Sequence, residues 1–302
     1  TIMEHHSTLL PLQKLAKIKK MNLKFLELDS YFDLDLYDIK NLVSEKTKIV
    51  SITLASNVLG TINDIKSIIE EIKKINKNIF VICDMTSGFS HMNINMKELG
   101  KYVDAGYFSL HKAFGPTGVG VLLIKRNLSR QMYPSILGGG IISNVQKESF
   151  DLRSDIKAFE AGTSNIAGII GASETIKFLE SVKNKSYEYI QRLTEIFLKK
   201  IKELNIDENF KINIFAGRSD RNVGIVSFQI IVNRKEIHSQ NVVEIFAKHN
   251  IQVRAGHHCV EPLINYLNIP NGLTRVSFHI YNNENDIEKV ILVLKEIKNT
   301  FL

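Results

Sequence analysis

Two short apolar runs flank a helical pattern in the first third of the chain. Residues 48–55 (KIVSITLA) and 78–84 (NIFVICD) are rich in β-branched side chains, and this predicts buried strands. Between them, residues 62–75 carry apolar side chains at helical spacing, and Asn63 or Asp64 could cap the helix. This order predicts a β-α-β unit with two parallel strands.

Two more strands are expected at residues 104–109 and 119–125. The alternation of short apolar strands with helices predicts an α/β domain built on a mostly parallel sheet flanked by helices. Ligands of such sheets bind beyond the carboxyl ends of the strands, and Asp84 and Ser109 fall at two of these ends. We therefore expect both side chains to line a site.

The pattern changes after the glycines at residues 138–140. Helical periodicity extends over residues 166–204, and the most favourable boundary lies within residues 183–187. We expect a large domain over residues 1–182 and a small α+β domain over residues 183–302. The small domain is predicted to hold strands at 221–232, 250–254 and 274–280, and helices at 241–249 and 283–300.

The composition is that of a folded globular protein. The 302 residues are 44% hydrophobic and 24% charged, enough for a substantial core. The net charge of +7 is spread over lysines on helical stretches, so we interpret it as solvated surface and expect no nucleic-acid partner. No apolar run approaches the ~18 residues of a membrane span. Two cysteines provide no disulfide framework, which favours a soluble protein in a reducing compartment.

A lysine and a cysteine far apart in the sequence carry the chemistry. Lys112 precedes a tight loop at residues 115–118 (GPTG), and Cys259 ends the run 254–259 (RAGHHC). A lysine amine can condense with the aldehyde of pyridoxal 5′-phosphate, whereas a cysteine thiolate can attack sulfur. The pair points to sulfur chemistry on an amino acid.

Asp84 and the histidines beside Cys259 allow more than one interpretation. A buried carboxylate is costly unless a cation meets it, and a pyridinium nitrogen would be such a cation, although Asp84 alone could be a helix cap. His257, His258 and Cys259 could form a metal cluster, but adjacent histidines do not easily converge on one ion. We therefore expect no metal, and we interpret Cys83 as an inert core thiol.

Residues 104–112 (DAGYFSLHK) strongly resemble the cofactor-lysine segment of the class V aminotransferase superfamily. Within this superfamily, Cys259 indicates a resemblance to the cysteine desulfurases. Further matching stretches are residues 4–6 (EHH), 56–60 (SNVLG), 159–165 (FEAGTSN), and 254–259 followed by Arg275. The ordered set is most similar to group II, the SufS-type desulfurases and their selenocysteine lyase relatives. It implies a pyridoxal-phosphate-dependent transferase of fold type I, with a smaller α+β C-terminal domain.

The resemblance implies that one set of residues surrounds pyridoxal 5′-phosphate: His5, Asn57, Asp84, Ser87, Ser109, His111, Lys112 and Thr163. Lys112 would bond to the aldehyde, and Asp84 would keep the ring nitrogen protonated. His5 would stack on the ring and assist proton transfers. Asn57 would lie beside the ring and the substrate.

The phosphate of the cofactor has its own expected contacts. Ser109 and His111 would hold it within one subunit. Thr163 would reach the phosphate of the neighbouring subunit, so the resemblance implies a homodimer whose interface is part of the active site.

Cys259 would be the catalytic nucleophile that takes sulfur from the substrate and carries it as a persulfide. Its thiol must lose a proton, and His257, His258 or the cofactor could accept it. Arg275 would bind the substrate carboxylate through its planar guanidinium, with Arg254 as a second contact.

The sequence departs from the family pattern at three places. Ser87 stands where the family usually carries a Gln that bonds to the phenolic oxygen of the cofactor, and Leu110 replaces a usual Gly. Leu110 could crowd the phosphate or merely occupy a tolerant backbone position. Each change could shift cofactor affinity by about 1 kcal/mol. The family's chain also begins well before its EHH motif, so we expect that an N-terminal segment is missing from this sequence.

The function implied by the resemblance is conversion of L-cysteine to L-alanine, with sulfur passed to an acceptor of the SufE or SufU kind for iron-sulfur cluster assembly. Bacterial cytoplasm and a plastid-type organelle are both compatible with this SUF-pathway role. Selenocysteine lyase activity is one alternative, because the same residues could process selenium. A non-catalytic homologue that serves as a binding scaffold is another.

Overall fold

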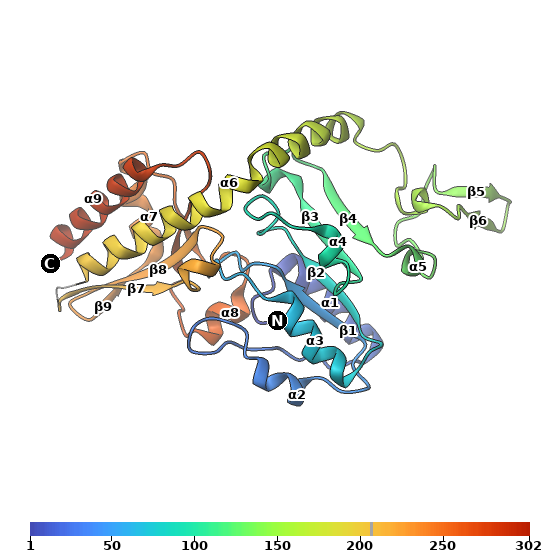
Figure 1. Cartoon of the computed structure of the whole chain (residues 1–302), viewed down its shortest axis with the longest axis horizontal. Coiled ribbons are helices and arrows are strands. Elements are labelled where there is room, and N and C mark those ends of the chain that lie inside the picture. The colour runs from blue at the N-terminus through green and yellow to red at the C-terminus, as the bar shows by residue number, and fades with distance from the viewer. Residues whose placement is uncertain (206–207) are drawn as a thin grey trace.

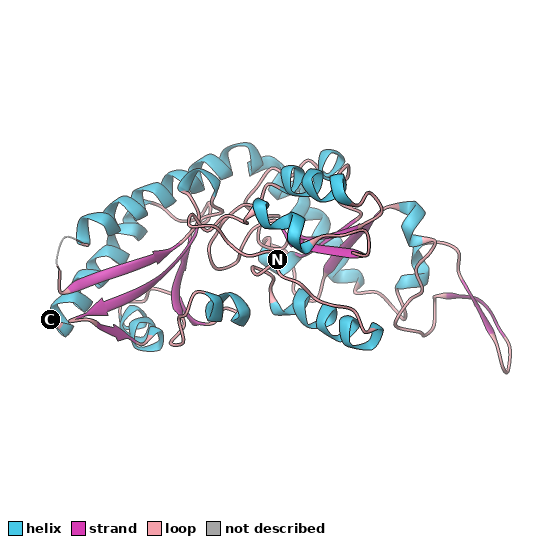
Figure 2. Ribbon diagram, turned by 90° about the horizontal axis from the view of Figure 1, so that it is seen from below, coloured by secondary structure: helices cyan, strands magenta, loops and turns pink. Residues whose placement is uncertain are grey.

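The structure is a computed structural model that describes residues 1–205 and 208–302. The described residues form three sheets; the two larger ones lie in different parts of an elongated molecule, and one long helix runs from one to the other (Figure 1). Helices flank the two larger sheets (Figure 2). The N-terminus lies near the middle of the molecule and the C-terminus at one end (Figure 1).

The larger unit contains a four-stranded sheet in the order β1-β2-β3-β4. Its strands are β1 (Ile49–Thr53), β2 (Phe80–Asp84), β3 (Ala105–Ser109) and β4 (Gly120–Ile124). β1 pairs with β2 and β2 with β3 in parallel, whereas β4 is antiparallel to β3. All four predicted strands are confirmed, and so is the mostly parallel sheet.

The predicted β-α-β unit is also confirmed. Helix α3 (Ile65–Ile75) joins β1 to β2 and buries one apolar face, including Ile65, Ile68, Ile69 and Ile72. Asp64 is the N-cap, because its carboxylate accepts the backbone N–H of Ser67. Asn63 is buried instead, and its amide donates to the Thr53 carbonyl at 2.8 Å.

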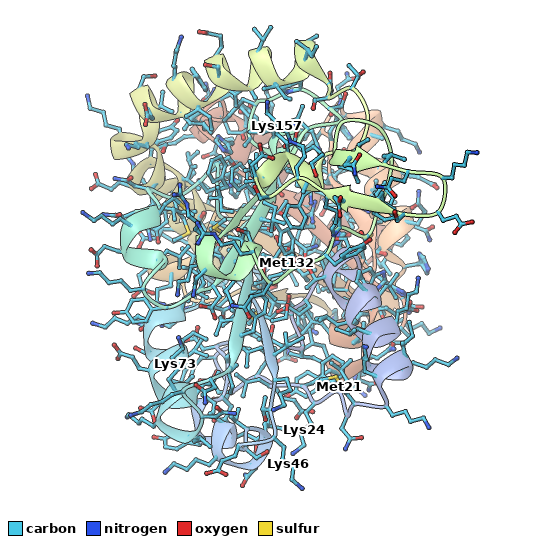
Figure 3. The ribbon with its side chains drawn as sticks, turned by 90° about the vertical axis from the view of Figure 1, so that its right-hand side faces the viewer. Met21, Lys24, Lys46, Lys73, Met132 and Lys157 are labelled. Atoms are coloured by element: carbon cyan, nitrogen blue, oxygen red, sulfur yellow. The ribbon has the colours of Figure 1, made fainter. Side chains whose placement is uncertain are left out.

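Further elements surround this sheet: α1 (His6–Lys19), α2 (Ile39–Leu42), α4 (Met96–Leu99), α5 (Arg126–Ser129), and 3₁₀ turns at Leu36–Asp38, Leu110–Lys112 and Ile156–Phe159. Strands β5 (Ile142–Val145) and β6 (Phe150–Leu152) form a hairpin that projects away from the body (Figure 1). Lys24 and Lys46 are exposed in two loops and Lys157 in a 3₁₀ turn (Figure 3), in keeping with a dispersed positive charge.

Helix α6 (Ile166–Leu204) has the bounds that the periodicity predicted. Ala172 and Ile176 pack against the core of the larger unit, whereas Leu193 and Phe197 belong to the core of the smaller one. The expected boundary between residues 182 and 183 therefore lies inside a continuous helix.

The smaller unit holds an antiparallel sheet in the order β10-β11-β8-β7, with β9 paired to β8. Its elements are β7 (Phe210–Phe215), a 3₁₀ turn (Ser219–Arg221), β8 (Ile225–Val232), β9 (Lys235–Ile237), α7 (Ser239–Lys248), β10 (Arg254–Gly256), β11 (Leu273–Ser277) and α9 (Glu284–Phe301). Helix α8 (Glu261–Tyr266) lies between β10 and β11 in the chain, but its Leu263 and Ile264 pack in the core of the larger unit. The α+β character is confirmed. The strand predicted at residues 250–254 is wrong in position, because β10 begins only at Arg254.

Candidate active site

Asp84 ends β2 at the carboxyl edge of the larger sheet, where the pattern predicted a ligand site. It is 5% exposed. Its Oδ1 accepts the backbone N–H of Thr86 at 2.8 Å, and its Oδ2 accepts the hydroxyl of Thr8, in the first turn of α1, at 3.1 Å. These bonds satisfy part of the carboxylate and leave it able to meet a cationic partner.

A tyrosine extends this network. Tyr107 is the register partner of Asp84 on β3, and its hydroxyl is hydrogen-bonded to that of Thr8. Because Thr8 has one hydroxyl hydrogen and gives it to Asp84, Tyr107 must donate to Thr8. Burial, followed by the charge of Asp84, raises the pKa of Tyr107, which keeps the phenol protonated as this donor.

Lys112 ends the 3₁₀ turn that directly follows β3. Desolvation by the surrounding protein lowers the pKa of its amine, and the positive charges of Arg275 and Arg254 lower that pKa further. The negative charges of Asp84 and Cys259 act in the opposite direction. The chain thus brings charged residues of both units around one amine, and the lowered pKa increases the fraction of its neutral, nucleophilic form.

The turn around Lys112 also explains one departure from the family pattern. The Leu110 side chain is 1% exposed and packs in the core of the larger unit, so it does not project into solvent. This supports the tolerant-position interpretation of Leu110. Ser109 Oγ and His111 Nδ1 lie 2.7 Å apart, so these two predicted phosphate contacts are next to each other.

The Cys259 loop has a strained backbone. His258 and Cys259 have φ values of 51° and 60°, in the left-handed region that is costly for residues other than glycine. Asn57 donates its side-chain amide to the His258 carbonyl at 2.8 Å, and the Asn57 carbonyl accepts from Arg275 Nη1 at 2.7 Å. Asn57 therefore ties the strained loop to β11.

The histidines beside Cys259 face other groups. Burial lowers the pKa of His258 to about 4, and its Nε2 bonds to the Leu273 carbonyl at 3.0 Å. His257 lies 3.5 Å from Glu261. The polar group that the structure places at Cys259 Sγ is Arg254 Nη2, at 3.9 Å. Within the described residues, no group of three or more His, Cys, Asp or Glu side chains is arranged to hold a metal ion.

Arg254 and Arg275 are direct register partners on β10 and β11. Like charges opposite one another on adjacent strands are destabilising. Burial, and then the charge of Arg254, lower the pKa of Arg275 to about 10, and the buried Nε of Arg275 has no hydrogen-bond acceptor within residues 1–205 and 208–302. An anion such as a carboxylate would offset both costs.

The structure also places the remaining predicted residues. His5 is the N-cap of α1. Burial and then the charge of Lys112 lower the pKa of its ring, whereas the charge of Asp84 raises it, so the ring lies within electrostatic range of both groups. Ser87 is partly buried in the turn after β2. Thr163 is exposed in the loop before α6, and no described contact links it to the other predicted residues.

Thr8 and Tyr107 are contributors that sequence reasoning missed. Thr8 lies on α1, a helix that was not predicted, since Pro11 interrupts its pattern. Tyr107 lies within a predicted strand, and parallel pairing with 78–84 could have placed it beside Asp84.

These residues fit pyridoxal 5′-phosphate with an amino-acid substrate. A buried carboxylate suits the ring nitrogen, a lysine of lowered pKa suits the aldehyde, and two crowded guanidiniums suit a substrate carboxylate. Together with the parallel sheet, they define the class of pyridoxal-phosphate-dependent proteins of fold type I.

The chain belongs to the class-V aminotransferase family, whose sequence model, described as "Aminotransferase class-V", matches residues 1–290. It is 38% identical over 302 residues to a "Probable cysteine desulfurase" of Staphylococcus aureus, covering 100% of this chain and 70% of that protein. A protein of the same name from Pyrococcus abyssi is 36% identical over 296 residues, with 97% and 70% covered.

Solved structures agree with this assignment. The apo structure of a cysteine desulfurase from Thermococcus onnurineus NA1 matches with a TM-score of 0.88 and 32% identity, over 98% of this chain and 71% of that one. The cysteine desulfurase CsdA from Escherichia coli matches with a TM-score of 0.87 and 25% identity, over 100% and 71%. The expectation of fold type I is confirmed. None of the described helices combines the length and apolar content needed to cross a membrane.

Proposed function

We propose that this chain is a pyridoxal-phosphate-dependent cysteine desulfurase that converts L-cysteine to L-alanine and leaves the sulfur on Cys259. The observation that carries the proposal is the position of Cys259: its carbonyl accepts the backbone N–H of His6 at 2.8 Å, next to His5, and its Sγ lies 3.9 Å from Arg254, one of the two guanidiniums that lower the pKa of Lys112. A thiol and an amine at one site match the two chemistries that the reaction needs. The names of the similar proteins support the same activity.

The cofactor would be held by residues of the larger unit. Asp84 would pair with the ring nitrogen, His5 would lie against the ring, and Lys112 would bond to the aldehyde. Ser109 and His111 would bind the phosphate. When bound, pyridoxal 5′-phosphate supplies an electron sink for the bonds at the substrate Cα.

The other residues act on the substrate. Arg275, assisted by Arg254, would bind the carboxylate, and Asn57 would adjoin the substrate from the larger unit. Lys112 would move the proton at Cα. The Cys259 thiolate would form a bond to the substrate sulfur as the carbon–sulfur bond breaks, which leaves a persulfide on the protein and, after protonation, alanine.

Within the cysteine desulfurases, we assign the chain to group II. It would act as a homodimer and pass its sulfur to an acceptor of the SufE or SufU kind. The sulfur would be used for iron-sulfur cluster assembly. Exposed Thr163 lies beside Ile166 and Ile170, which are 61% and 66% exposed, and a second subunit would cover this region. Cys259 is only partly exposed, which favours delivery to a dedicated acceptor over release to solvent.

The test is turnover of L-cysteine by the full chain with pyridoxal 5′-phosphate, measuring alanine, sulfide and the mass of the peptide that contains Cys259. We expect Cys259→Ser to keep the cofactor absorption band and to lose the persulfide. Cys83→Ala is the matched control, because Cys83 is fully buried with a pKa raised by burial. Turnover that survives Cys259→Ser would contradict the proposal, and faster turnover of selenocysteine than of cysteine would favour the lyase alternative.

A further inference from the structure

His6 contacts the Cys259 loop at two points, the sulfur-bearing residue itself and the residue two positions after it. Its backbone N–H donates to the Cys259 carbonyl at 2.8 Å. Its ring Nε2 accepts the backbone N–H of Glu261, the first residue of α8, at 3.0 Å. Nε2 must be unprotonated to accept this bond, so the neutral ring carries its hydrogen on Nδ1.

The loop to which His6 is hydrogen-bonded contains the strained backbone at residues 258 and 259. Residues 258 and 259 are both left-handed, and such a pair persists only where the surroundings hold it in place. Asn57 holds the His258 carbonyl, and His6 holds the next carbonyl and the amide two residues beyond. Both residues belong to the larger unit, and Val260, which follows Cys259, packs in the core of that unit. On the other side of the loop, β10 pairs in the sheet of the smaller unit, so the loop crosses from one unit to the other.

The first turn of α1 connects this grip to the cofactor pocket. The hydroxyl of Thr8 donates to the Asp84 carboxylate at 3.1 Å, and the ring of His5 lies within electrostatic range of Lys112 and Asp84. His6 lies between them in the sequence and faces the Cys259 loop. One helical turn therefore fixes the groups around the amine and the loop of the thiol relative to each other.

We propose that His6 is a positioning residue for Cys259, and that it holds the sulfur-accepting thiol in register with the pocket by clamping the Cys259 carbonyl and the Glu261 amide to α1. The catalytic consequence rests on the proposed function, but the clamp itself does not. The backbone bond of His6 remains in any substitution, so the contribution that can be tested is that of the ring.

The first experiment needs neither cofactor nor substrate. Hydrogen exchange of the Glu261 amide is compared in the full chain and in His6→Phe, which keeps a ring but removes the acceptor, and in His6→Gln, whose carbonyl can take the place of Nε2. We expect exchange about 5- to 10-fold faster in His6→Phe, the range of one net hydrogen bond, and near wild type in His6→Gln. His238→Phe is the matched control, because His238 caps α7 through the same kind of ring-to-amide bond. Unchanged exchange in His6→Phe, or equal acceleration in both variants, would overturn the proposal.

The second experiment measures sulfur transfer in a single turnover with pyridoxal 5′-phosphate and L-cysteine. We expect His6→Phe to form the Cys259 persulfide about tenfold more slowly, with cofactor affinity and KM within about twofold of wild type, because a misplaced nucleophile affects the chemical step. His6→Gln should recover most of the rate. A persulfide rate in His6→Phe equal to that of wild type would overturn the positioning role. Failure of the wild type itself to form a persulfide would refute the proposed function, and the exchange experiment would still decide the clamp.

Discussion

Thr8 is expected to matter more than a threonine on a helix normally does, because two buried groups depend on its hydroxyl. Thr8→Val removes the hydroxyl with little change of volume, so no cavity term enters. Asp84, which is 5% exposed, loses the donor at 3.1 Å, and Tyr107 loses its acceptor. A hydrogen bond to a buried charge contributes about 1.5–3 kcal/mol, so the free energy of unfolding should fall by about 2 kcal/mol.

The assay is urea denaturation of wild type, Thr8→Val, Tyr107→Phe and the double variant, with Thr8→Ser as the control that keeps the hydroxyl. Tyr107→Phe alone should cost about 1 kcal/mol, because it removes a neutral donor and leaves the Thr8 bond to Asp84 intact. The double variant should fall no further than Thr8→Val, since Tyr107 has already lost its acceptor there. Additive losses, or a change below about 0.5 kcal/mol in Thr8→Val, would refute the proposed chain of donors.

Two further predictions concern charge. Burial and the charges of Arg275 and Arg254 lower the pKa of Lys112, so Arg254→Met should raise this pKa. Borohydride trapping of pyridoxal 5′-phosphate on Lys112 should then shift to higher pH in the variant. A pH profile of trapping equal to that of wild type would contradict the prediction. His279, which is 6% exposed, has a pKa lowered by burial from 6.5 to about 4. The unfolded state therefore binds the proton first, and the contribution of His279 to stability should fall by about 1.4 kcal/mol per pH unit from pH 6.5 toward 4. His279→Gln should flatten this decline in urea denaturation, and an equal slope in variant and wild type would exclude the contribution.

The larger unit was predictable because its strands are short, apolar and bounded by polar residues. The run at 78–84 became β2 with its carboxylate at the edge of the sheet, and the run at 166–204 became α6. The missed strand β7 carries an alternating signal at Phe210 and Ile212, which are buried on the same face. The strand expected at 250–254 lies later in the chain than predicted. The apolar residues before Arg254 pack against the core of the smaller unit, and backbone pairing with β11 begins at Arg254.

The groups that carry chemistry were easier to predict than the groups that hold them. Lys112 and Cys259 are rare types in distinctive runs, so their roles could be inferred from the sequence. Thr8 and His6 act through one hydroxyl and one ring nitrogen, and their partners are distant in the sequence: Asp84 for the first, the Cys259 loop for the second. Such contacts follow from how α1 packs against both units, and no local pattern encodes that packing. The positions of the site residues thus depend on α1, a helix that local periodicity did not predict. For this reason the most informative substitutions are those of Thr8 and His6 in its first turn.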